Sequence, residues 1–175
     1  PKFHQHLKDL SRALKLLQDA GVPLKRDKCF FAAVQVKYLG LKVSHAGVEV
    51  DDDKIASVRQ ALPPTNKTGL RRFLGMTGFY RKIIPTYAKV AAPLTKYPKG
   101  DREDTFELDA EAIRAHEKLK LAVTSAPVLA LPNKEGEYVL ETDASASQLG
   151  VQLLQLQPDG SSRPLGFWSR NCNPA

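Results

Sequence analysis

Residues 70–82 read LRRFLGMTGFYRK, and this stretch decides how the middle of the chain folds. Successive residues of an α-helix lie about 100° apart, so apolar residues at spacings of three and four share one face. The pattern predicts a helix that Thr65 or Asn66 caps and that Pro85 ends, running to about residue 84. The predicted buried face contains Leu70, Phe73, Leu74, Thr77, Tyr80 and Ile84.

A basic stripe adjoins this apolar face, and two glycines lie on the same side of the helix. These residues are Lys67, Arg71, Lys82, Gly75 and Gly78, with Phe79 at the edge. A glycine inside a helix costs roughly 1 kcal/mol relative to alanine, so two of them need a physical reason. Either a nucleic-acid backbone or groove comes close to the helix, or another helix packs closely against it. Helical geometry alone does not choose between the two.

Basic charge is concentrated around the same helix. Between residues 65 and 100 there is no Asp or Glu, whereas this segment carries eight Lys and Arg residues. The net charge of the whole chain is +7, so the remainder is close to neutral. A block of one sign indicates a surface that binds a polyanion such as nucleic acid. A solvated basic surface without a partner would have the same composition.

Toward the N-terminus, the pattern predicts a helix and then a β-hairpin. Apolar residues recur at spacings of four and three from Phe3 to Leu17, and Gly21 marks the end of this amphipathic helix. β-Branched and aromatic residues at 34–44, a turn at Ala46-Gly47 and a returning strand at 48–50 predict the hairpin.

Three adjacent acids follow the hairpin. Asp51, Asp52 and Asp53 fit the cap and first turn of a short helix, running to about residue 62, better than they fit a metal site. Pro63-Pro64 breaks that helix, and another is predicted from Thr86 to Thr95.

Toward the C-terminus, a polar stretch at residues 98–104 predicts a domain boundary. Asp109 caps a helix that runs to about residue 124, with Ile113, His116, Leu119 and Val123 inward. The spacing of apolar residues then changes from the helical pattern. Segments 138–142, 150–156 and 164–168 predict three antiparallel strands, with a turn at residues 158–160.

Two classes of protein are not indicated by the composition. No apolar run approaches the roughly 20 residues of a membrane helix, and residues 1–4 do not resemble a signal peptide. Cys29 and Cys172 form no zinc-binding pattern and are predicted to be free thiols.

Several blocks of sequence together resemble the Pol polyproteins of gypsy-type LTR retrotransposons. The blocks are KCFF at 28–31, VKYLG at 36–40, residues 70–82, AAPL at 91–94, TSAPVL at 124–129 and ETDAS at 141–145. They occur in the family's order and spacing over essentially the whole chain. The family carries a Tyr-x-Asp-Asp polymerase motif just before the segment that resembles residues 3–20, so this chain is expected to begin after it.

The resemblance assigns roles to two nucleic-acid-binding elements. The hairpin at 36–50 resembles the primer grip, with Tyr38, Leu39 and Gly40 at its centre. In related retroviral enzymes a thumb helix follows the minor groove through positions i, i+4 and i+8, the middle one a glycine. The matching residues here are Arg71, Gly75 and Phe79, while Lys67 and Lys82 are predicted to contact phosphates.

Asp143 resembles the first catalytic carboxylate of an RNase H domain and is therefore the predicted catalytic and metal-binding residue. RNase H chemistry uses two metal ions held by several carboxylates, and the other family acids are expected beyond this chain. Mg²⁺ is accordingly expected in the complete parent enzyme and is not expected to bind tightly here. Leu108 stands where a Trp is common and His116 where a Phe is common, which leaves open a decayed element or a truncated gene model.

The predicted fold class is α+β: the end of the palm and the helical thumb of a reverse transcriptase, followed by the first antiparallel strands of an RNase H-like domain. The predicted parts are palm (1–34), primer grip and thumb (35–100) and RNase H-like region with its linker helix (101–175). The predicted function is primer–template binding for an RNA-directed DNA polymerase, with the chain alone inactive. Its predicted partners are an RNA–DNA hybrid or duplex and the remainder of the polyprotein, inside the cell in the cytoplasm, virus-like particles or the nucleus. The alternative is a host-adopted or decayed nucleic-acid-binding module without an enzymatic role.

Overall fold

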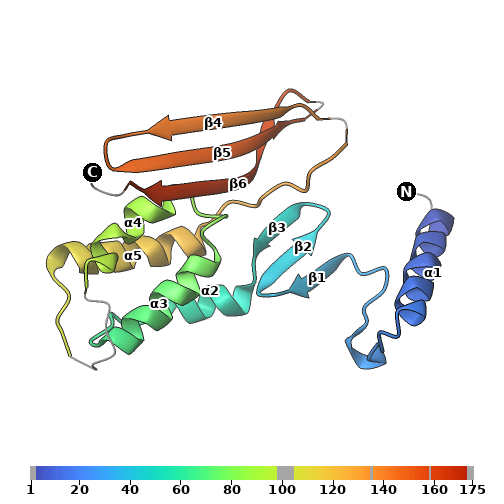
Figure 1. Ribbon diagram of the computed structural model, residues 1–175, viewed down its shortest axis with the longest axis horizontal. Helices are drawn as coiled ribbons and strands as arrows, with labels where there is room; N and C mark the ends of the chain where they lie inside the picture. Colours follow the sequence, from blue (N-terminus) through green and yellow to red (C-terminus); the bar gives the residue numbers. More distant parts are fainter. Residues whose placement is uncertain (1–2, 98–104, 135, 158, 173–175) are drawn as a thin grey trace. The chain divides into compact units, whose positions relative to one another are not determined.

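The computed structural model of the chain describes residues 3–97, 105–134, 136–157 and 159–172. The chain divides into two compact units, Pro1–Ala33 and Val34–Ala175 (Figure 1). The boundary predicted at residues 98–104 lies outside the described residues.

The first unit contains the predicted amphipathic helix α1 (Phe3–Asp19) and a short 3₁₀ helix, η1 (Arg26–Lys28). Gly21 has a φ of 68°, and the Val22 amide donates to the Leu17 carbonyl, which confirms Gly21 as the helix stop. No described residue of α1 is fully buried, although Leu17 is partly covered.

The second unit begins with a three-stranded antiparallel sheet where the sequence predicted a two-stranded hairpin. Its strands are β1 (Gln35–Tyr38), β2 (Leu41–Ser44) and β3 (Gly47–Val50), in the order β1-β2-β3. The additional turn consists of Leu39 and Gly40, whose φ angles are 49° and 78°. Two successive residues with positive φ are typical of a tight hairpin turn, but leucine rarely adopts this conformation. The prediction of one continuous strand from residue 34 to residue 44 was therefore wrong.

The three adjacent acids attach helix α2 (Asp52–Arg59) to this sheet. Asp51 is the N-cap residue, but its side chain makes no capping hydrogen bond. The Lys37 ammonium instead lies 2.8 Å from Asp53 and 2.9 Å from Asp51, and these two carboxylates raise its pKa. Lys42 similarly lies 3.1 Å from Asp52. The acids thus occupy the predicted first turn, but their partners are lysines of the sheet.

Helices and a strand from distant parts of the sequence share the core of the second unit. Helices α4 (Tyr87–Thr95) and α5 (Ala110–Thr124) pack together, and Figure 1 shows them beside a second sheet, which residues 138–171 form. The core includes Val58 of α2, Leu94 of α4, Leu119 and Val123 of α5, and Phe167. Described residues on both sides of segment 98–104 therefore contribute to one core.

Helix α5 begins where the sequence predicted, because the Asp109 carboxylate accepts a hydrogen bond of 2.7 Å from the Ala112 amide. The prediction for Ile113 was wrong. This side chain is 43% exposed, whereas Ala112 is fully buried. The buried face at this end of the helix is thus rotated by one residue.

The second sheet confirms the three strands predicted at the C-terminal side. It consists of β4 (Tyr138–Ala144), β5 (Gln148–Leu156) and β6 (Ser162–Asn171), antiparallel in the order β4-β5-β6. Gly160 has a φ of 81° in the connection between β5 and β6. The two sheets are linked through residues 129 and 130, since Leu129 pairs with Val48 and the Ala130 amide donates to the Pro164 carbonyl.

His116 is a buried polar residue in this core. It has no solvent exposure, and its ring centroid lies 4.2 Å from that of Phe73. Burial lowers the pKa of His116, and the nearby Glu117 carboxylate, 3.2 Å from Nδ1, only partly opposes this shift. His116 is therefore neutral in the folded chain at pH 7.

Replacing His116 with phenylalanine is expected to reduce the loss of stability at mildly acidic pH. Since the pKa is lower in the folded state, the unfolded chain takes up more protons as the pH falls below about 6.5, and stability falls with it. The phenylalanine variant lacks this proton uptake. Urea unfolding between pH 7.5 and 5 measures the difference, with exposed His45→Gln as the control. An unchanged pH dependence in His116→Phe would contradict the assignment.

Candidate nucleic-acid interface

Helix α3 (Lys67–Phe79) presents the predicted nucleic-acid-binding stripe. Asn66 caps it as predicted, accepting a 2.7 Å hydrogen bond from the Gly69 amide. Leu70, Phe73 and Thr77 are buried as expected. On the opposite side Arg71, Gly75 and Phe79 are all exposed, so positions i, i+4 and i+8 form one accessible line along the helix.

The two glycines of α3 have different surroundings. A β-carbon added at Gly75 would meet no atom of a neighbouring element within 4 Å. At Gly78 the same β-carbon would lie 3.3 Å from the Tyr87 hydroxyl. Gly78 thus allows α4 to pack closely, while no described residue of the chain accounts for the glycine at position 75.

The structure corrects the predicted positions of Lys67 and Lys82 on the basic stripe of the helix. Lys67 is only 8% exposed and is engaged in an interaction within the chain, so it does not offer a surface cation. Helix α3 ends at Phe79 and not near residue 84, although Tyr80 and Ile84 remain buried. Lys82 is exposed in the following turn, where its carbonyl accepts a hydrogen bond from the Phe167 amide. Lys82 therefore lies beside β6 and is not part of the α3 stripe.

The predicted primer-grip residues form the turn between β1 and β2. Tyr38 and Leu39 are 64% and 67% exposed. Gly40 is packed against Tyr80, whose hydroxyl donates a 3.3 Å hydrogen bond to the Gly40 carbonyl. This contact joins the turn to the C-terminal end of α3. Local sequence patterns do not indicate this contact, although a tyrosine at the end of an apolar stripe usually needs a partner for its hydroxyl.

Ion pairing reduces the basic character of segment 65–100. The Lys96 ammonium lies 2.6 Å from the Glu111 carboxylate of α5. The Arg81 guanidinium donates to the Ser169 carbonyl at 3.0 Å, which neutralises no charge. The segment lacks acids in the sequence, yet part of its charge is balanced by acids from elsewhere.

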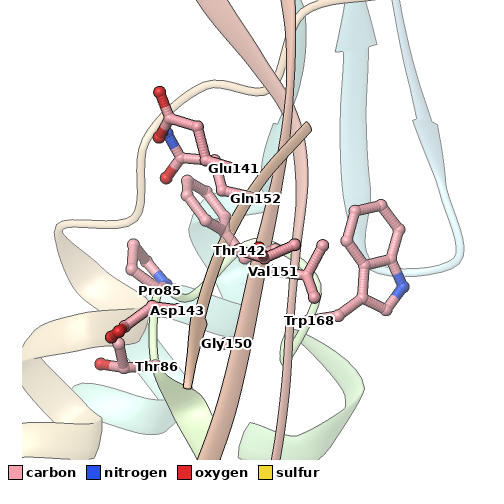
Figure 2. A pocket seen from close by; sticks show the side chains of 10 residues that line it. Pro85, Thr86, Glu141, Thr142, Asp143, Gly150, Val151, Gln152 and Trp168 are labelled. Carbon is pink, nitrogen blue, oxygen red and sulfur yellow. The ribbon is translucent and has the colours of Figure 1, made fainter. Parts of the chain in front are cut away.

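Asp143 lies on β4 at a cavity of about 270 Å³. Figure 2 shows its carboxylate beside Pro85 and Thr86, which precede α4. Glu141 extends from the same face of the strand, as predicted, and accepts a 3.3 Å hydrogen bond from Gln152. Thr86 has a φ of 52°, a strained conformation for a β-branched residue. The part played by residues 85 and 86 in this cavity was not visible in the sequence.

The described part of the chain does not fit a complete two-metal centre. Within it, no group of three or more His, Cys, Asp or Glu residues is arranged to hold a metal ion. Asp143 and Glu141 are exposed, and the Glu141 carboxylate accepts a hydrogen bond from the side-chain amide of Gln152.

No helix among the described residues is long and apolar enough to cross a membrane.

Comparison with known proteins identifies the class to which this architecture belongs. Residues 91–175 match the family described as the RNase H-like domain found in reverse transcriptase. The whole chain is homologous to the reverse transcriptase/RNase H-like region of retrotransposon Pol polyproteins, as the resemblance predicted.

Among these relatives is the retrovirus-related Pol polyprotein from transposon 297 of Drosophila melanogaster, 38% identical over 97% of this chain and 15% of the relative. The Pol polyprotein from transposon opus of the same species is 34% identical over 98% of this chain and 18% of its own length. The transposon Tf2-3 polyprotein of Schizosaccharomyces pombe is 31% identical over 98% of this chain and 13% of its own length. The chain thus spans less than a fifth of the length of these relatives. The sequence identity of these relatives, over nearly the whole of this chain, favours a Pol region over an adopted or decayed module.

Solved structures of foamy viral protease-reverse transcriptase share the fold. One, in complex with an RNA/DNA hybrid, has a TM-score of 0.80 at 20% identity and covers 97% of this chain and 23% of its own. Another, designated dRH and in complex with double-stranded DNA, has the same TM-score and identity, with coverages of 98% and 30%. The α+β fold class predicted from the sequence is confirmed.

Proposed function

We propose that this region binds the primer–template duplex or RNA–DNA hybrid of a reverse transcriptase. The observation that carries the proposal is the open surface at Gly75, flanked by exposed Arg71 and Phe79 on one line of α3. A glycine with no neighbouring element beside it allows a nucleic-acid groove to approach the helix backbone. The Tyr38–Leu39 turn, joined to the C-terminal end of α3 through Tyr80, supplies a second exposed element.

Nucleic-acid-bound relatives of this fold support the same proposal. The foamy viral enzymes were solved with double-stranded DNA and with an RNA/DNA hybrid. Binding by this chain should be largely independent of base sequence and should weaken with added salt, because cations that contact phosphates release counterions. We further propose that the complete protein acts inside the cell, in the cytoplasm, in virus-like particles or in the nucleus.

Gly75→Ala is expected to weaken hybrid binding several-fold while leaving the chain as stable or more stable, by up to roughly 1 kcal/mol. The added methyl group fills the space through which the groove approaches, and it meets no atom of a neighbouring element. Fluorescence polarisation with a labelled RNA–DNA hybrid measures affinity, and thermal unfolding of the same sample measures stability.

Gly78→Ala is the matched control on the same helix. Its methyl group would lie 3.3 Å from the Tyr87 hydroxyl, which hydrogen bonds to Thr77 and to the Leu74 carbonyl hold in place. Gly78→Ala should therefore be less stable than Gly75→Ala, and its affinity should change only as the folded fraction changes. If Gly75→Ala loses stability or keeps full affinity, α3 does not follow the groove in the proposed way.

Asp143 is proposed to contribute one carboxylate to an Mg²⁺-dependent RNase H centre in the complete protein. The cavity beside Pro85 and Thr86 leaves its carboxylate accessible. The described residues alone do not supply the remaining ligands of a two-metal centre.

A further inference from the structure

The face of the second sheet opposite Asp143 carries a groove lined by cations and an aromatic ring. Figure 2 shows Trp168 pointing away from the side on which Asp143 and Glu141 lie. The groove has a volume of about 450 Å³, and Arg81, Lys82, Leu149, Val151, Trp168 and Arg170 line it. Three of these residues are basic, and none of the lining residues is acidic.

The cations of the groove come from two segments that are distant in sequence. Arg81 and Lys82 follow α3, whereas Arg170 lies on β6, two residues after Trp168 and on the same face of the strand. The Arg81 guanidinium is held by the Ser169 carbonyl at 3.0 Å. The backbone between Lys82 and Phe167 is also hydrogen-bonded, at 2.9 Å. The Arg81 side chain and the Lys82 backbone are therefore held beside β6, the strand that carries Trp168 and Arg170.

Trp168 is placed as a stacking surface. Its six-membered ring lies over Gly166, since a β-carbon at position 166 would come within 2.8 Å of that ring. Any side chain at Gly166 would displace the indole. Trp168 remains 42% exposed, and Val151 is its directly paired neighbour on β5. An indole held flat along a strand, with aliphatic residues around it, offers a surface for a flat ligand.

We propose that this groove binds an unpaired nucleotide segment of a single-stranded nucleic acid, with a base stacked on Trp168 and phosphates contacting Arg81, Lys82 and Arg170. Single-stranded sites combine an aromatic platform with cations that follow the backbone, and stacking tolerates every base. Three lining cations and no lining acid favour an anionic ligand. The inference goes beyond the proposed duplex grip, since it concerns an unpaired strand and none of the residues of the Arg71–Gly75–Phe79 line.

Trp168 is the only tryptophan of the chain, so its fluorescence reports directly on the groove. Titration of the 175-residue chain with an unlabelled thymidine oligonucleotide at low salt should quench this fluorescence in a saturable way. Trp168→Leu should weaken binding of a labelled oligonucleotide by roughly five- to 150-fold. Arg170→Ala should lower the slope of log affinity against log salt by about 0.7. Arg114→Ala, an exposed cation of α5 that does not line the groove, should leave both quantities unchanged.

Separate controls distinguish this inference from the duplex grip. In Gly75→Ala, the single-stranded oligonucleotide should still quench the Trp168 fluorescence. In Arg170→Ala, adding the Gly75→Ala change should still weaken hybrid binding by the same factor. Absence of saturable quenching would overturn the inference, even if hybrid binding depends on Gly75 as proposed. Equal quenching by polyglutamate, a polyanion without bases, or by a blunt duplex would overturn it as well.

Discussion

Leu119→Ala should lower the free energy of unfolding by about 2–5 kcal/mol. Leu119 of α5 is fully buried in the core of the second unit, which also contains Leu94 of α4 and Phe167 of β6. The truncation removes apolar contacts and leaves a cavity among elements from both sides of segment 98–104. Urea denaturation followed by circular dichroism gives the free energy.

Leu121→Ala provides the control, because Leu121 lies two residues away on the same helix and is 66% exposed. Its replacement should change stability by less than about 0.5 kcal/mol. If Leu119→Ala is equally mild, α5 does not share a core with α4 and β6.

Gly47→Ala should destabilise the chain by about 2–6 kcal/mol, through backbone strain and a steric clash that add together. Gly47 has a φ of 136°, which alanine rarely adopts. A β-carbon there would also clash with the Leu129 carbonyl oxygen, at the point where β3 pairs with Leu129. Backbone cannot move aside as the end of a flexible side chain can.

Gly160→Ala separates the two causes. Gly160 has a φ of 81°, but an added β-carbon would meet nothing within 4 Å, so only the strain of about 1–2 kcal/mol remains. Thermal or urea unfolding of both variants provides the comparison. Similar losses for the two would show that the contact with Leu129 is not formed in solution.

Periodicity and capping residues allowed much of the fold to be predicted from the sequence. Asn66 and Asp109 cap their helices as expected, and the three C-terminal strands occur where the alternation of residues placed them. These features depend on short stretches of sequence, which is why they could be read without knowledge of the tertiary structure. The family resemblance predicted a retrotransposon Pol polyprotein, and the comparisons confirm that family.

Features that depend on tertiary contacts could not be predicted in this way. The turn at Leu39 requires positive φ from a leucine, which no local rule suggests. Lys67 was expected on the surface because of its charge, yet it is buried. Apolar residues continue beyond the end of α3, so Tyr80 and Ile84 appeared helical although they reach the core from a turn.

Some features of the candidate site were also predictable from helical spacing, whereas others depend on tertiary contacts. Helical spacing correctly placed Arg71, Gly75 and Phe79 on one line. Only the structure separates Gly75 from Gly78, because the difference lies in what each glycine faces. The groove beside Trp168 combines residues about 90 positions apart in the chain, so sequence periodicity could not reveal it.

The Arg163 guanidinium donates a hydrogen bond to the Ala46 carbonyl, 117 residues earlier in the chain. This long-range contact has a consequence for synthesis on the ribosome. Together with Phe167, which completes the core, it means that the second unit cannot close until β6 has left the exit tunnel. Until then the nascent helices expose the apolar faces that they later bury. Contacts of such long range form slowly and leave intermediates prone to aggregation, so the newly made chain should depend on chaperones at this stage.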